Sequence, residues 1–285
     1  MQAALDIDDL TSEAPIVLTL PPHDLADLAD EVQAYHAHFA PLSQRREQRA
    51  WAAVYLRGLL LTDVPRTNVE AMALRLRGAG PAAARTVRAL QQFVREGAWD
   101  DAALLSAHQD LVEETLGEDD GVFIIVGSDG PKQGTPSVGV ARQWCGASGK
   151  TDNCQAGVYL GYARRRGYTL LERRLYLHAS RFAPDHQEVW RACALPPGLR
   201  FQTKLELAAE LVAQVQRQRR VRARWLVCAE GYGQDPALLD RGAATGLWYL
   251  AEVPGLTPVW PPPIAPTASA SCANLVCLTH REVSL

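Results

Sequence analysis

The chain has 285 residues, of which 47% are hydrophobic and 21% are charged, and its formal net charge is −3. This composition is ordinary for a globular protein, and no apolar run approaches the roughly 20 residues that span a bilayer. The acidic N-terminus, MQAALDIDDL, lacks the basic and apolar regions of a signal peptide, so we expect a cytoplasmic protein with no membrane partner. The six cysteines show no paired spacing, which favours reduced thiols over disulfides or a metal clip.

Helical spacing dominates the first part of the chain after an expected flexible tail at residues 1–22. Apolar residues three and four apart predict a helix capped by Asp24 and a second helix capped by Ser43. Three more helices are expected, at residues 68–76, 82–95 and 101–116. The sequence therefore predicts an all-helical domain at residues 23–117.

Strand-like runs follow, at residues 121–127, 137–145, 155–163 and 168–177, and their short turns suggest an antiparallel meander. Thr203 and Glu206 have the spacing of a capping box at the start of a helix that ends near Gln218. A parallel strand at 225–229, a short helix from Pro236 and a strand at 247–253 come next.

This order predicts an α/β fold: a ribonuclease-H-like mixed sheet flanked by helices at residues 118–255, preceded by the all-helical N-terminal domain. Residues 256–285 are rich in Pro, Ala and Ser, and we expect them to form a linker or disordered tail.

Several segments have a recognisable pattern, in the right order and spacing from about residue 32 to 255. They include VRALQQFVREGAWDD, GSDGPKQGTPSVGVARQWCGASGKTDNCQAGVYLGYARRRGYTLLERRLYL, FQTKLELA and EGYGQDPALLDRGAATGLWYLAEVP. The chain resembles the transposases of the 701 family of insertion sequences, which are DDE-superfamily endonucleases. The resemblance implies DNA cutting and strand transfer, with two Asp and a later Glu holding divalent metal ions, usually Mg²⁺. Two metal ions would polarise the attacking oxygen and stabilise the leaving oxygen.

The metal-binding residues that the resemblance implies are missing from this chain. The first Asp of the family immediately precedes the Gly-Ser-Asp turn, which places Val126 at its position. Alignment on the YGQDP motif places Ala229 at the second, and no position after residue 255 matches the Glu. Neither Val nor Ala can ligate a hard cation, so we expect a nuclease-dead relative with no metal and no cofactor.

Nearby polar residues are the remaining cleft candidates. Asp129 and Glu230 are potential surrogate acids, although Asp129 lies three residues past Val126 and Glu230 would face the opposite side of a strand. Arg142 is expected to form a structural ion pair with one of them, Tyr232 to pack, and His178 to be structural. The full set of cleft candidates is Asp129, Lys132, Gln143, Glu230, Tyr232 and His178.

Charge is distributed unevenly along the chain. Residues 1–120 hold ten Arg against twenty Asp and Glu, whereas residues 161–224 hold fourteen Lys and Arg against five acids. The basic run of Arg217, Arg219, Arg220, Arg222 and Arg224 could simply complement a helix C-terminus. Five arginines in eight residues exceed that need, so we favour contact with a phosphate backbone, joined by Arg164 to Arg166.

Three hypotheses about function remain open. The first is a domesticated, nuclease-dead derivative that binds DNA or a protein partner. The second is an enzyme of small-molecule metabolism that reuses the former metal cleft, made more apolar by Val126 and Ala229, for metal-free chemistry. The third is a decayed remnant, which the consistent core pattern of the sequence disfavours. The sequence identifies no substrate, DNA site or oligomeric state.

Overall fold

The structure is a computed structural model that describes residues 22–61, 68–97, 100–134, 137–183, 187–192, 195–196, 198–254 and 276–278. Contacts divide the chain into two units between Leu104 and Leu105, within helix α5 (Asp101–Leu116). The domain boundary expected from the sequence lies later, at residue 117. No described helix combines the length and the apolar character that crossing a membrane requires.

The first unit is helical. Its elements are α1 (Pro22–Phe39), η2 (Ala40–Leu42), α2 (Arg46–Leu59), α3 (Val69–Arg77) and α4 (Pro81–Glu96). Met72 and Ala73 of α3 and Leu90 and Phe93 of α4 are buried, which follows from the three- and four-residue spacing of their apolar positions.

Two caps predicted for these helices are wrong. Helix α1 begins at Pro22, so Asp24 lies inside it. Helix α2 has Arg45 at its N-cap with no side-chain cap, because Ser43 instead terminates η2, where its N–H donates to the carbonyl of Ala40. By contrast, the Asn68 side chain caps α3 by accepting a hydrogen bond from the Ala71 N–H at 2.8 Å.

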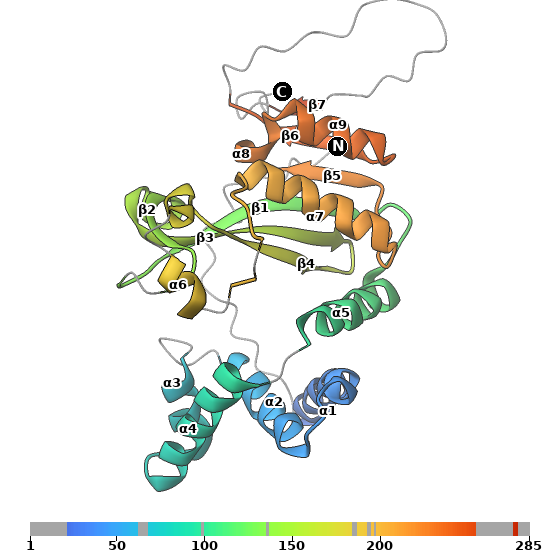
Figure 1. Ribbon diagram of the computed structural model, residues 1–285. Coiled ribbons are helices and arrows are strands. Elements are labelled where there is room, and N and C mark those ends of the chain that lie inside the picture. The colour runs from blue at the N-terminus through green and yellow to red at the C-terminus, as the bar shows by residue number, and fades with distance from the viewer. Residues whose placement is uncertain are drawn as a thin grey trace, which may run out of the picture. The chain divides into compact units, whose positions relative to one another are not determined.

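The second unit contains a seven-stranded mixed sheet, with the order β2-β3-β1-β5-β6-β7 and β4 also paired to β3 (Figure 1). The strands are β1 (Val122–Pro131), β2 (Val140–Cys145), β3 (Lys150–Arg164), β4 (Gly167–Tyr176), β5 (Trp225–Cys228), β6 (Trp248–Glu252) and β7 (Val276–Leu278). Strands β1, β3 and β4 form an antiparallel meander, and β5, β6 and β7 follow in parallel on the other side of β1. The predicted α/β, ribonuclease-H-like arrangement is confirmed.

Helices α7 (Lys204–Gln218) and α9 (Pro236–Ala244) cover one face of this sheet (Figure 1). Buried residues of β1, β3 and β5 that point to this face, including Ile125, Leu160 and Leu226, form one core with Leu211 of α7 and Leu238 of α9. The capping box at the start of α7 is present: the Thr203 side chain accepts from the Glu206 N–H, and the Glu206 carboxylate accepts from the Thr203 N–H.

The C-terminal prediction needs correction. Only a linker or disordered tail is expected at residues 256–285, yet Val276–Leu278 form β7 and pair with Leu250–Glu252 of β6. The three residues Val-Cys-Leu are apolar enough for a strand, but an apolar run this short is not distinctive within a Pro- and Ala-rich sequence. The rest of the predicted tail lies outside the described residues, as does the predicted tail at residues 1–21.

Candidate functional site

Two apolar side chains stand where the pairing of β1 with β5 ends, halfway along β1 and just past the last residue of β5. The strands pair in parallel from Val122 with Trp225 to Ile125 with Cys228, and the N–H of Ala229 donates to the carbonyl of Ile125 at 3.3 Å. Val126 and Ala229 therefore follow the last register pair on neighbouring strands. Carboxyl ends of adjacent parallel strands are a common place for a functional site, but neither residue offers a polar side chain.

The side chain of Asp129 has a structural role, because it binds the main chain of a neighbouring turn. Its carboxylate accepts hydrogen bonds from the N–H groups of Gly146 and Ala147, each at 3.0 Å, and lies 3.6 Å from the Cys145 thiol. It thereby caps the single turn η3 (Gly146–Ser148). Burial alone would raise the pKa of Asp129, but these N–H donors, the thiol and the charge of Lys204 together hold it below its ordinary value.

Tyr232 belongs to the short helix α8 (Glu230–Gly233) that directly follows β5. The side chain is buried, and its hydroxyl has no hydrogen-bond partner among the described residues. Burial raises the pKa of Tyr232 to about 12. The hydroxyl would lie only 3.0 Å from a Cβ on Gly127, so a glycine at that point of β1 lets the tyrosine pack closely.

The other cleft candidates are dispersed. Gln143 is buried and donates to the carbonyl of Cys154 at 3.1 Å, which is a bond between neighbouring strands. Lys132 is exposed after the end of β1. His178 caps the turn η4 (Ala179–Phe182) through Ser180, with 2.9 Å between its Nδ1 and the serine Oγ. Glu230 starts α8 instead of extending β5, and its side chain lies outside the described residues.

Of the two ion-pair partners expected for Arg142, Asp129 is not bound to it, and the side chain of Glu230 lies outside the described residues. The arginine side chain is exposed on β2, and within the described part of the chain it makes no ion pair with Asp129. The alternation of β2 explains the difference, because Arg142 and Trp144 point outward while Gln143 and Cys145 point inward.

These residues do not fit the divalent metal centre that the resemblance implies. Such a centre needs several anionic oxygens at one point. Here Val126 and Ala229 supply none, and both oxygens of Asp129 already accept main-chain bonds. Among the described residues, no group of three or more His, Cys, Asp or Glu side chains is placed to hold a metal ion.

Acidic side chains neutralise part of the basic run. Arg220 pairs with Asp110 of α5 at 2.5 Å. Arg222 pairs with Glu113 of α5 at 2.5 Å and with Asp119 at 2.7 Å. On the neighbouring β3–β4 hairpin, Arg164 pairs with Glu118 and Asp120; with a side chain only 8% exposed, it is the most shielded of these cations.

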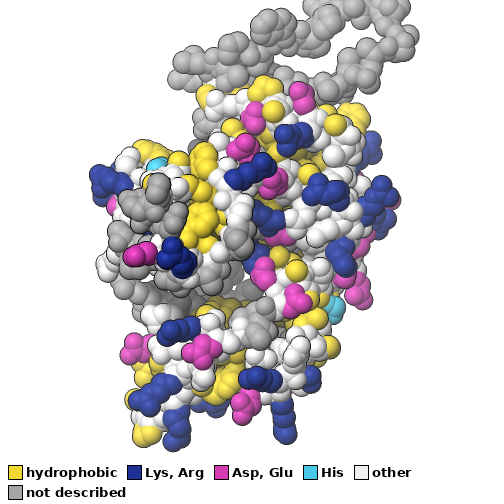
Figure 2. Space-filling model, in the orientation of Figure 1, with side chains coloured by type: hydrophobic (Ala, Val, Ile, Leu, Met, Phe, Trp, Pro, Cys, Tyr) yellow, Lys and Arg dark blue, Asp and Glu magenta, His cyan; other side chains and the backbone are white. Residues whose placement is uncertain are grey.

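Other arginines of the same region remain unpaired. Arg217, Arg219, Arg165 and Arg166 are exposed and make no ion pair among the described residues. Arg224 lies over the ring of Trp248 at 5.7 Å. Figure 2 shows basic and acidic side chains interspersed over the sheet unit. The run thus divides into arginines that hold α5 and the 118–120 loop and arginines that face solvent.

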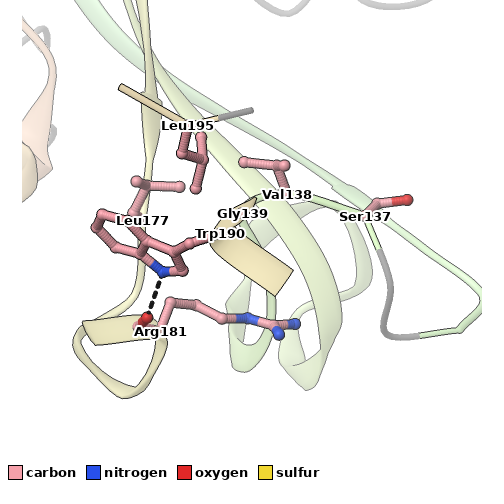
Figure 3. A pocket seen from close by; sticks show the side chains of 7 residues that line it. All are labelled: Ser137, Val138, Gly139, Leu177, Arg181, Trp190 and Leu195. Atoms are coloured by element: carbon pink, nitrogen blue, oxygen red, sulfur yellow. Dashed lines mark hydrogen bonds between the residues drawn. The ribbon is translucent and has the colours of Figure 1, made fainter. Parts of the chain in front are cut away.

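Two hollows lie away from the ends of β1 and β5. A cavity of about 10 Å³, enough for one water molecule, lies between Val138, Leu177, Trp190 and Leu195 (Figure 3). Beside it, the Trp190 indole N–H donates to the Arg181 carbonyl at 2.7 Å. In the helical unit, a cleft of about 200 Å³ is lined by Arg45 at the N-cap of α2 and by residues of α2 and α4 that include Glu47, Trp51, Gln92 and Glu96.

A buried carboxylate was not anticipated from the sequence. Glu172 of β4 is 2% exposed and accepts from Gln214 of α7 at 2.9 Å, while Arg174 lies 3.2 Å away. Strand alternation should direct residue 172 and residue 171 to opposite faces, but an irregularity between Leu160 and Gly161 shifts the register beside them. Nothing in the local sequence marks such a bulge.

In a comparison with known families, residues 38–273 match a family described as DDE superfamily endonuclease. No curated protein and no solved structure matches the chain. The match covers most of both units and agrees with the sheet order found here. The chain therefore belongs to the DDE superfamily endonucleases.

Proposed function

We propose that this protein is a member of the DDE superfamily that no longer cuts DNA and acts instead as a domesticated DNA-binding protein. The observation that supports the loss of cutting is the pair Val126 and Ala229, which directly follow the last paired residues of β1 and β5. Removing two carboxylate ligands leaves the chain without the charge that concentrates divalent ions. Asp129 is a poor substitute because its oxygens are bound to Gly146 and Ala147.

A cleavage assay tests this loss directly. Pure protein is incubated with supercoiled plasmid and with linear DNA bearing the terminal repeats of related elements, in Mg²⁺ or Mn²⁺. We expect no metal-dependent nicking. Nicking that copurifies with the monodisperse protein, and that EDTA abolishes, would refute the proposal.

DNA binding is proposed for the solvent-facing arginines. Arg217 and Arg219 lie near the end of α7, and Arg165 and Arg166 lie on the β3–β4 turn. The 118–121 loop connects the two places, because Arg164 binds Glu118 and the N–H of Arg224 donates to the Gly121 carbonyl. Unpaired guanidinium groups can neutralise phosphates without first breaking an ion pair.

Matched arginine variants separate binding from stability. Arg217→Ala/Arg219→Ala should weaken binding of duplex DNA in a low-salt gel-shift titration and reduce the salt dependence by about one unit per lost phosphate contact. Arg220→Ala should mainly lower thermal stability, because its partner is Asp110. Arg142→Ala, at an exposed position of β2, is the control for loss of one positive charge and is compared with Arg217→Ala and Arg219→Ala made separately. Equal loss of binding in all of these variants would contradict the assignment.

A second proposal is a metal-free enzyme that uses the same strand ends for an organic ligand. It is supported by the apolar pair Val126 and Ala229 and by the buried hydroxyl of Tyr232 nearby, which has no partner among the described residues. A thermal-shift screen of metabolites, with and without EDTA, tests it. Stabilisation that persists in EDTA and is lost in Tyr232→Phe is expected; a flat response across the screen counts against it.

A further inference from the structure

Strand β1 extends well beyond its neighbour β5. All ten residues of β1 pair with β3, from Val122 with Ala163 to Pro131 with Cys154. Strand β5 accompanies only the first four, ending at Ile125 with Cys228. Among the described strands, the second half of β1, Gly127–Pro131, therefore has a partner on one side only.

The main-chain groups that face the vacant side can be assigned. The carbonyl of Gly121 accepts from Trp225 at 3.1 Å and that of Ile125 accepts from Ala229 at 3.3 Å, so odd-numbered residues of β1 direct their main chain toward β5. The register of β1 with β3 continues without a bulge. Because main-chain direction alternates along a strand, Gly127 and Asp129 present their N–H and C=O groups to the vacant side. These groups have no main-chain partner among the described residues.

Tyr232 of α8 packs over one face of β1 at Gly127, but the edge itself is accessible. Gly127 and Ser128 are exposed, and the Asp129 carboxylate is turned to η3 by its bonds to Gly146 and Ala147. Pro131 has no N–H and so limits the edge to a short segment. Beyond it, Lys132 is exposed and makes no ion pair within the described ranges.

We propose that the edge Gly127–Asp129 binds an extended, acidic peptide segment of a partner protein as an added strand. Alternating donors and acceptors are complementary to another polypeptide main chain, and strand addition uses this complementarity. A nucleic-acid backbone lacks the N–H donors that would satisfy the carbonyls of Gly127 and Asp129. The acidic side chain or C-terminal carboxylate of the peptide meets the amine of Lys132.

The probe is a displayed library of random eight-residue peptides selected on the immobilised full chain. Selected peptides are synthesised and their affinities measured by fluorescence anisotropy. A series with single N-methyl groups is then tested, since each removes one N–H. We expect losses of roughly tenfold at alternate peptide positions and little change between them. Selection of no peptide above background, or losses without the two-residue period, would overturn the proposal.

Variants of the protein give a second measurement. Gly127→Pro removes an N–H that no described strand uses and should abolish peptide binding. Gly127→Ala places the same Cβ 3.0 Å from the Tyr232 hydroxyl but keeps the N–H, so it should retain peptide binding. Ser128→Pro removes a group directed at β3 and should lower the thermal midpoint. Lys132→Glu should weaken the binding of acidic peptides. Arg142→Glu is the matched charge reversal on β2 and should leave that binding unchanged. Duplex DNA is also added as a competitor of the bound peptide, with wild type and with Arg217→Ala/Arg219→Ala. If the DNA displaces the peptide from wild type but not from this variant, the peptide binds at the arginine surface, which would also overturn the proposal. DNA binding and peptide binding therefore fail independently.

Discussion

Removing the carboxylate of Asp129 should destabilise the sheet unit. The residue caps η3 with two main-chain bonds of 3.0 Å, and loss of such a cap costs about 1–2 kcal/mol. For a unit of this size, 1 kcal/mol lowers the melting temperature by roughly 2–4 °C, so Asp129→Ala should melt roughly 2–8 °C lower at pH 7. Asp129→Asn keeps one acceptor oxygen, so its melting temperature should lie between those of wild type and Asp129→Ala.

The stabilisation by Asp129 should decrease as the pH is lowered. Because the pKa of Asp129 is lowered on folding, its stabilisation is fully present above the ordinary value of 3.8 and is lost as the pH falls through the folded value. Urea denaturation followed by circular dichroism should therefore show the difference between wild type and Asp129→Ala shrinking below about pH 4. Asp240→Ala, at an exposed position of α9, is the control. A variant as stable as wild type at pH 7, or a difference unchanged at pH 3, would refute the capping role.

Three further changes test packing and capping. Tyr232→Phe removes a buried hydroxyl that has no partner among the described residues and should leave the free energy of unfolding in urea unchanged or raise it by up to about 1 kcal/mol; a clear decrease would show that the hydroxyl has a partner. Gly233→Ala would place a Cβ 2.2 Å from the Glu252 carbonyl and should cost about 1–3 kcal/mol, measured by the same denaturation, whereas a neutral result would contradict the close approach of α8 and β6. Thr203→Ala removes half of the capping box and should cost about 1 kcal/mol, with Thr203→Ser restoring most of it.

Local patterns predicted the secondary structure well where the signal was strong. The α7 helix followed from Thr203 and Glu206, and α5 from its regular apolar spacing, because both depend on residues close in sequence. Caps near short helical turns were less predictable. Ser43 has the chemistry of an N-cap, but the turn η2 that precedes it uses its N–H and leaves Arg45 at the start of α2.

The candidate site shows where sequence reasoning ends. The positions of Val126 and Ala229 beside each other required the pairing of strands about a hundred residues apart, and the resemblance supplied what local patterns could not. The structural task of Asp129 depends on η3, whose residues Gly146–Ser148 gave no helical pattern. Likewise, the division of the arginine run reflects acids at 110 and 113 on α5, which no local pattern links to residues 220 and 222.

The separation of β1 and β5 in sequence also bears on how the sheet forms. The β3–β4 hairpin joins adjacent segments, whereas β1–β5 pairing must close a loop from residue 125 to 225, with its larger loss of chain entropy. Contacts between distant segments generally slow folding. We therefore expect the meander to assemble before β5 arrives, so that the strand ends bearing Val126 and Ala229 come together late. In a newly made chain, the edge of β1 that faces β5 would therefore stay unpaired longer than the edge that faces β3. This late-paired edge carries Val126, the position at which the resemblance places the first metal-binding Asp.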